Sequence, residues 1–158
     1  MADELISSRA LARSQAWIDA MEHAIVDLAD EAATAGVMKA AGRPCADQIL
    51  EACAQIQGRR PETVAELLDA TNRRRAECLG LDNQWARDGS SAYLRLDGCN
   101  CTLVKAGLAK PNPTHCLCSV GMFEALFSSV CRGSVTVEVL EAVGFGDTCC
   151  EFRVEFQE

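Results

Sequence analysis

Ten cysteines are spread over the 158 residues of this chain, and two Cys-x-Cys pairs stand close together in its second half. The first pair is Cys99 and Cys101, and the second is Cys116 and Cys118. Thiolates bind soft metal ions, and they are also strong nucleophiles. The two pairs therefore direct the search for function to the chemistry of sulfur.

A metal site is the first interpretation of the two pairs. Residues two apart in an extended strand project to the same face, roughly 7 Å apart, and zinc takes four thiolate or imidazole ligands in a tetrahedron. We expect a thiolate site made by Cys99, Cys101, Cys116 and Cys118, with zinc or another thiophilic metal as the cofactor. His115 adjoins the second pair and is able to replace one sulfur.

A catalytic cysteine is the alternative. Cys118 precedes Ser119, which suits the N-cap of a helix, and the free N–H groups and dipole of a helix start favour a thiolate. A nucleophilic thiol needs a base, and His115 is the histidine close to it in sequence. On this interpretation the chain is a cysteine-dependent hydrolase, with Cys118 as the nucleophile and His115 as the base.

A third interpretation assigns the cysteines no chemistry. Cysteine packs as a small hydrophobic residue and is often buried. The chain is then an interaction module that forms a homodimer through its long first helix.

The elements that position these residues change type half-way along the chain. In the first half, apolar side chains recur at steps of three and four, which predicts helices over residues 7–41, 46–57 and 61–80. Gly42-Arg43-Pro44 is expected to separate the first helix from the second.

The second half alternates apolar and polar residues, which predicts strands over residues 92–96, 135–140 and 150–156. Residues 99–105 are expected to be extended, and one helix is expected to begin at Ser119. The prediction is a single α+β domain over 1–158, with a helical layer (1–80) packed on a twisted antiparallel sheet, the strands and the inserted helix lying in 90–158.

Charge and composition limit the partners. The formal net charge is −8, which argues against nucleic acid and anionic membranes. The one basic run, Arg73-Arg74-Arg75, is expected on a solvated helix face. The start of the chain lacks a secretory signal pattern, and no window reaches the roughly 18 apolar residues of a membrane span. We therefore expect a cytoplasmic protein with free cysteines, and a small-molecule ligand as its partner.

The last sixty residues also resemble a known pattern, which consists of Cys99-x-Cys101, Cys116-x-Cys118-Ser119-x-Gly121 with Leu126-Phe127, Gly133-x-Val135-x-Val137-Glu138-x-Leu140, and Gly146-Asp147 with Cys150-x-Phe152-x-Val154. This pattern resembles a family of small cysteine-rich bacterial and archaeal proteins of unassigned function. That family is similar to the aminothiazoline-carboxylate hydrolases, and distantly to the vinyl-reductase-type hydrocarbon-binding domain. The resemblance implies an α+β ligand-binding fold, and it admits ring-opening hydrolysis of a small sulfur heterocycle such as aminothiazoline carboxylate.

Overall fold

The structure is a computed structural model, and it describes residues 8–158. Its helices are α1 (Ser8–Leu28), α2 (Glu31–Gln57), α3 (Val64–Arg73), the π-helix η2 (Arg74–Cys78), α4 (Thr102–Lys105), α5 (Pro113–Ser128) and the 3-10 turn η3 (Val143–Phe145). Its strands are β1 (Ala86–Asp88), β2 (Ser91–Leu96), β3 (Val135–Glu141) and β4 (Cys150–Phe156).

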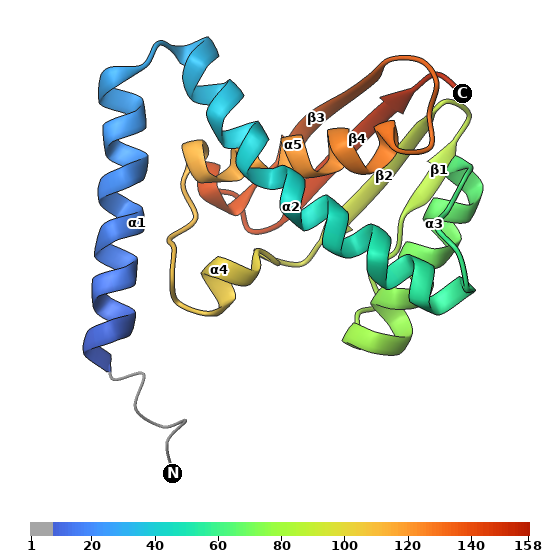
Figure 1. Ribbon diagram of the computed structural model, residues 1–158, viewed down its shortest axis with the longest axis horizontal. Coiled ribbons are helices and arrows are strands. Elements are labelled where there is room, and N and C mark those ends of the chain that lie inside the picture. The colour runs from blue at the N-terminus through green and yellow to red at the C-terminus, as the bar shows by residue number, and fades with distance from the viewer. Residues whose placement is uncertain (1–7) are drawn as a thin grey trace.

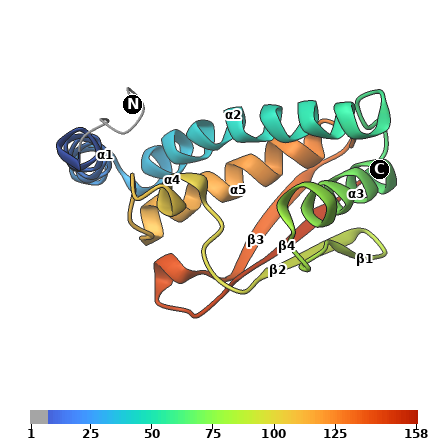
Figure 2. The ribbon, with the colours of Figure 1, turned by 90° about the horizontal axis from the view of Figure 1, so that it is seen from below.

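The strands form one antiparallel sheet in the order β1-β2-β4-β3. Helices α2 and α5 lie over one face of this sheet, with α3 near β1 (Figure 2), and the two helices cross each other in the view of Figure 1. Helix α1 stands apart from both layers at one end of the molecule (Figure 1). The predicted α+β fold, with helices first and an antiparallel sheet after them, is confirmed.

The hydrophobic core lies between the sheet and the helices that cover it. Alternate residues of β2 and β4 point inward, as the period of two in the sequence predicts. Trp85 meets the rings of Phe123 and Phe127 edge-on, with centroids 5.1 and 5.2 Å away. The buried core cluster draws on α2, α3, α5 and the strands, and it contains no residue of α1.

The first helix ends earlier than the sequence predicts. Asp30 caps a new helix, because its side chain accepts a hydrogen bond from the backbone N–H of Ala33 at 2.8 Å. Helix α2 then continues through Gly42 and Pro44 to Gln57. The predicted break at Gly42-Arg43-Pro44 is therefore wrong.

Gly42 has a packing role in α2. A Cβ at this position would lie 1.9 Å from the carbonyl oxygen of Cys118, and a Cβ at Gly121 would lie 2.0 Å from the carbonyl oxygen of Lys39. The backbones of α2 and α5 thus touch at two glycines. This close crossing fixes where the first turns of α5 lie.

Two further boundaries differ from the prediction. Helix α5 begins at Pro113, not at Ser119, because Asn112 caps it and proline suits the first helical position. Cys116 and Cys118 therefore lie on the helix rather than before it. The expected extended segment at 99–105 instead turns into the short helix α4 after Cys101.

No helix in residues 8–158 is long and apolar enough to cross a membrane.

Candidate functional site

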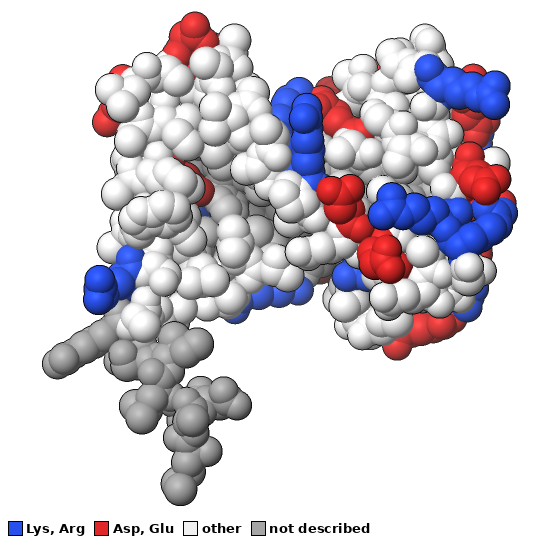
Figure 3. All heavy atoms as spheres, in the orientation of Figure 1, with Lys and Arg blue, Asp and Glu red and all other residues white. Residues whose placement is uncertain are grey.

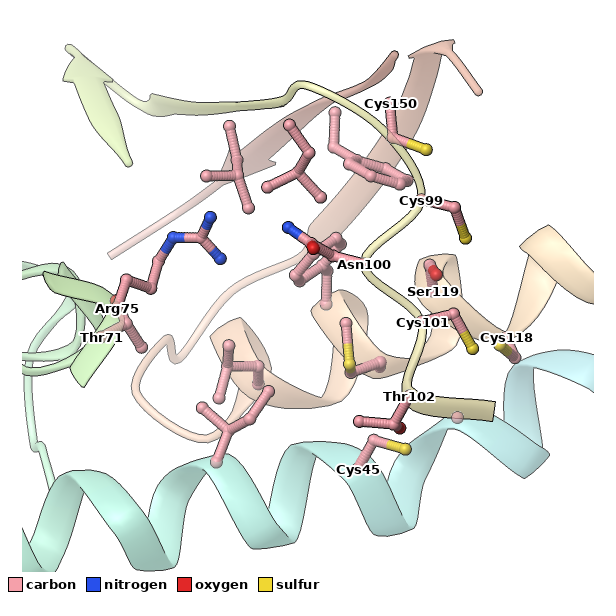
Figure 4. Close-up of a pocket in the computed structure, with 18 of the residues that line it drawn as sticks. Cys45, Thr71, Arg75, Cys99, Asn100, Cys101, Thr102, Cys118, Ser119 and Cys150 are labelled. Atoms are coloured by element: carbon pink, nitrogen blue, oxygen red, sulfur yellow. The ribbon is translucent and has the colours of Figure 1, made fainter. Parts of the chain in front are cut away.

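A pocket of about 410 Å³ opens between the helices and the sheet. Its walls come from α2, η2, α5, β2, β4 and the segment around α4, so that residues far apart in sequence share one space (Figure 4). Most of the wall is apolar, with Trp85, Leu94, Leu96, Phe123 and Phe152 among its members. The pocket suits a small ligand with a hydrophobic body.

One end of this pocket is lined by thiols. Its cysteines are Cys45 from α2, Cys99 and Cys101 from the segment before α4, Cys116 and Cys118 from α5, and Cys150 from β4. Figure 4 shows Cys45, Cys99, Cys101, Cys118 and Cys150 on the same side of the pocket. Both Cys-x-Cys pairs therefore line the same pocket, as the metal and the catalytic interpretations both require. All ten cysteines are free.

His115 links this end of the pocket to α1. Its Nδ1 lies 2.5 Å from Oε1 of Glu22, and its Nε2 lies 3.3 Å from Sγ of Cys101. His115 and Glu22 are only 4% and 5% exposed. A thiol, an imidazole and a carboxylate in this row form the arrangement that activates a nucleophilic cysteine.

Asn112 fixes the imidazole and the carboxylate relative to each other. Its Oδ1 accepts a hydrogen bond from the backbone N–H of His115 at 2.8 Å. Its Nδ2 donates to Oε2 of Glu22, also at 2.8 Å. The residue that caps α5 therefore also holds Glu22 in place, although Glu22 belongs to a different helix.

The contact with His115 sets Cys101 apart from its neighbours. Burial opposes ionisation of Cys101, but the hydrogen bond with His115 and the nearby backbone N–H groups of α4 outweigh it, so that the pKa of this thiol lies below its ordinary 9.0. The same hydrogen bond, together with Glu22, raises the pKa of His115 to about 9. The contact therefore favours the pair of a Cys101 thiolate and a His115 imidazolium.

The thiols on α5 are in the opposite situation. Burial, with neighbouring thiols adding to it, raises the pKa of Cys116 to about 11 and that of Cys118 to about 12. Both ring nitrogens of His115 already have partners, Glu22 and Cys101. The geometry therefore favours Cys101, and not Cys118, as the thiol that His115 serves.

The cysteines are not arranged as the ligands of a bound metal ion would be. Within the described part of the chain, no group of three or more His, Cys, Asp or Glu side chains is placed to hold a metal ion. Cys116 and Cys118 are two apart on a helix, where side chains point in different directions. The zinc site at Cys99, Cys101, Cys116 and Cys118 stays a prediction.

Two residues at this site have roles that the sequence did not predict: Glu22 behind His115, and Arg75 in the pocket wall. Glu22 lies among the apolar positions Ile18, Met21 and Ile25 of α1, and a carboxylate inside an apolar stripe is a usable sign of a buried acid. Arg75 was expected on a solvated face, but it is half-buried and lines the pocket together with Arg74. The π-helical turn η2, which carries both arginines, has no clear sequence signature.

A family model matches residues 7–158, which is nearly the whole chain. The chain belongs to the DUF6144 family. DUF6144 is described as a family of unknown function, and a comparison with curated proteins finds no match.

A solved structure has the same fold as this DUF6144 chain. It is subunit 3 of a trafficking protein particle complex from Naegleria fowleri, covalently bound to palmitic acid. The TM-score is 0.55 at 12% sequence identity, over 95% of this chain and 96% of that one. At this identity the similarity establishes the fold alone.

Proposed function

We propose that this DUF6144 chain is a small-molecule-binding domain whose Cys101 thiolate reacts with a carbonyl carbon of its ligand. The row Glu22–His115–Cys101, which opens on an apolar pocket, is the observation that carries the proposal. The proposal keeps the expected cysteine-dependent chemistry and His115, and it names Cys101 in place of Cys118 as the nucleophile.

The reaction begins with attack by the Cys101 thiolate on the carbonyl carbon of an ester or thioester. The carbonyl π pair moves to oxygen, and its return expels the leaving group, which takes the proton from Nε2 of His115. The products are an acyl thioester on Cys101, a neutral leaving group and a neutral imidazole. Glu22 accepts the hydrogen bond from Nδ1 and keeps the ring in the orientation that this proton transfer needs.

The fate of the thioester separates a binding domain from an enzyme. If water is excluded, the acyl group stays on Cys101. If water enters, neutral His115 takes one of its protons as the water attacks the thioester. The acid is released, and the Cys101 thiolate and the His115 imidazolium are restored, which makes the chain a hydrolase. The covalently bound palmitic acid of the structural neighbour supports the first outcome for a shared fold.

Acylation of purified protein tests the proposal. The protein is incubated with p-nitrophenyl decanoate, which releases a coloured leaving group, and the product is analysed by intact mass spectrometry. We expect one acyl group per chain, removable by hydroxylamine, and its loss in Cys101→Ala. A continuing release of nitrophenol in excess of one equivalent identifies the hydrolase.

Matched variants locate the reaction. Cys78→Ala removes an exposed thiol that does not line the pocket, and it should acylate like the unchanged protein. Cys118→Ala distinguishes the nucleophile inferred here from the one that the sequence predicts. Acylation that survives in Cys101→Ala and disappears in Cys118→Ala contradicts the assignment of Cys101.

A thiophilic metal is the second candidate function, because six thiols line one end of the pocket. Cys99, Cys101, Cys116 and Cys118 remain the proposed ligands, with zinc as the proposed metal. Elemental analysis of reduced protein, purified without added metal, is the test. Less than about a tenth of an equivalent of any transition metal contradicts this candidate.

Two expectations from the sequence complete the proposal. Ring opening of aminothiazoline carboxylate stays the predicted reaction if the chain is a hydrolase, and turnover of that compound by the protein and by Cys101→Ala tests it. A cytoplasmic location suits a site that needs reduced thiols, because reducing compartments keep cysteines free.

A further inference from the structure

Arg75 lies at the end of the pocket away from the cysteines, and its guanidinium is directed into the pocket (Figure 4). Its Nε donates to the backbone oxygen of Asn83 at 2.6 Å. Its Nη2 is buried and has no hydrogen-bond partner among the described residues. A buried donor without a partner destabilises the fold, and more so when it is charged. The guanidinium of Arg75 lines the pocket with donor capacity that no described residue uses.

A second donor faces the same place. Figure 4 shows the side chain of Asn100 directed toward Arg75 from the segment before α4. Oδ1 of Asn100 accepts a hydrogen bond from Nζ of Lys105. The amide NH₂ of Asn100 therefore remains as a donor beside the guanidinium of Arg75.

The end of the pocket away from Cys101 is basic. Arg74, Arg75 and Lys105 line the pocket, and none of its lining residues in the described part of the chain is Asp or Glu. The chain as a whole carries a formal charge of −8. Burial, and then the neighbouring Arg74, lower the pKa of Arg75, which is the direction expected for a cation without a counter-ion. A basic end of the pocket in an acidic protein indicates an anionic ligand.

Apolar side chains line the pocket between its two ends. Leu79, Leu81 and Trp85 line the pocket near η2, and Leu94, Leu96 and Phe152 line it from the sheet. A hydrophobic chain or ring is therefore the part of a ligand that fits between Arg75 and Cys101.

We propose that the ligand of this pocket is an amphipathic anion, whose carboxylate or similar group binds Arg75 and Asn100 while its apolar body extends toward Cys101. Only one part of this proposal, that the ligand has a reactive carbonyl near Cys101, rests on the proposed function. The anion site itself is independent of any reaction.

Equilibrium binding of two unreactive probes tests the anion site. Decanoate and 1-decanol share an apolar chain and differ in charge, and calorimetric titration measures both. An Arg–carboxylate hydrogen bond is charge-assisted and favours the anion, so we expect decanoate to bind about tenfold or more tightly than decanol. Arg75→Gln should remove this preference and leave the binding of decanol unchanged.

Two variants serve as controls. Arg73→Gln alters an exposed arginine that pairs with Glu77 and does not line the pocket, so it should keep the preference for decanoate. Arg75→Lys keeps the charge without the planar fork and should keep part of the preference. If Arg75→Gln loses both probes through misfolding, Arg75→Lys decides the question. Equal affinity for decanoate and decanol in the unchanged protein overturns the proposal. So does an undiminished preference for decanoate in Arg75→Gln or, if that variant misfolds, in Arg75→Lys.

The proposal of an anion site and the proposal of a reactive thiol can be contradicted independently of each other. The titration with decanoate and decanol involves no acylation, so its result stands even if Cys101 is never acylated. Conversely, acylation of the unchanged protein by the neutral decanoyl ester is measured without a carboxylate ligand, so it stands even if decanoate is not preferred over decanol.

Discussion

One contact distinguishes Cys101 from the other thiols of its pocket. Nε2 of His115 lies 3.3 Å from its sulfur, and Nδ1 of the same ring faces the buried carboxylate of Glu22. Cys116 and Cys118 lie in the same cavity but are held protonated by burial. The reactivity of this cysteine cluster is therefore expected to be uneven.

The rate of alkylation by iodoacetamide should show this difference. Iodoacetamide reacts with thiolates only. Cys101 should therefore be labelled first at pH 7, because its pKa lies below 9.0, whereas Cys118 should resist labelling because its pKa is about 12. Peptide mapping after brief labelling measures the order. Equal labelling of Cys101 and Cys118 contradicts the assigned environments.

Acylation should depend on pH differently from alkylation. The leaving group takes a proton from His115, and the pKa of His115 is raised to about 9. As the pH rises through this value the imidazolium is lost, so acylation of Cys101 by a decanoyl alkyl thioester should slow. Alkylation, which needs only the thiolate, should not slow. In Glu22→Gln the pKa of His115 should fall, and the decline of acylation should move to lower pH.

The residue types of this site could be predicted from the sequence, but their pairing could not. The two Cys-x-Cys pairs and His115 all line one pocket, as their spacing suggested. Which thiol contacts His115 depends on where α5 begins. Cys101, the thiol that does so, lies fourteen positions before His115 in the chain. Glu22 lies ninety-three positions before His115, a distance at which single-sequence reasoning has no pairing signal.

At the scale of elements, the crossing of α2 and α5 positions the site. Gly121→Ala should destabilise the fold, because the new Cβ would lie 2.0 Å from the carbonyl oxygen of Lys39, which is backbone and yields little. Overpacking of this kind costs about 1–3 kcal/mol or more of the free energy of unfolding. Urea denaturation followed by circular dichroism measures it.

Gly36→Ala is the control for Gly121→Ala, because Gly36 lies on α2 but away from the crossing with α5. A Cβ at Gly36 meets no atom within 4 Å. Gly36→Ala should therefore stabilise the protein by about 0.5–1 kcal/mol, since alanine loses less entropy than glycine in a helix. If the Gly121 and Gly36 variants change stability alike, the crossing is not as close as described.

These glycines also explain the error in the predicted helix boundaries. Glycine followed by proline usually signals the end of a helix. Here the missing side chain of Gly42 is needed for contact with α5, and the boundary between two helices lies instead at Asp30, whose side chain caps the start of α2. The local sequence indicates only the tendency to form a turn. The need for glycine at this position comes from the close contact with α5, which lies about eighty residues further along the chain.

At the scale of the whole molecule, α1 is distinguished by its exposed apolar surface. Trp17 is 66% and Leu28 is 88% exposed, and the face of α1 seen in Figure 3 carries few charged atoms. The homodimer expected from the sequence would cover this surface with a second copy of α1. Light scattering after size exclusion should give a dimer mass that falls to a monomer in Trp17→Glu and persists in Phe145→Glu, whose exposed ring lies at η3. A monomer mass for the unchanged protein contradicts the homodimer.

The opposite signs of the Arg75 end of the pocket and of the molecule have a kinetic consequence. At a distance an anionic ligand meets the field of a chain with net charge −8 and is repelled, and it meets Arg75 only after it has come inside. Dissolved ions shorten the reach of that field to about 8 Å at physiological ionic strength, but they screen charges buried in a pocket much less. Adding sodium chloride should thus accelerate the capture of decanoate in stopped-flow mixing while changing its release little, the reverse of electrostatic steering.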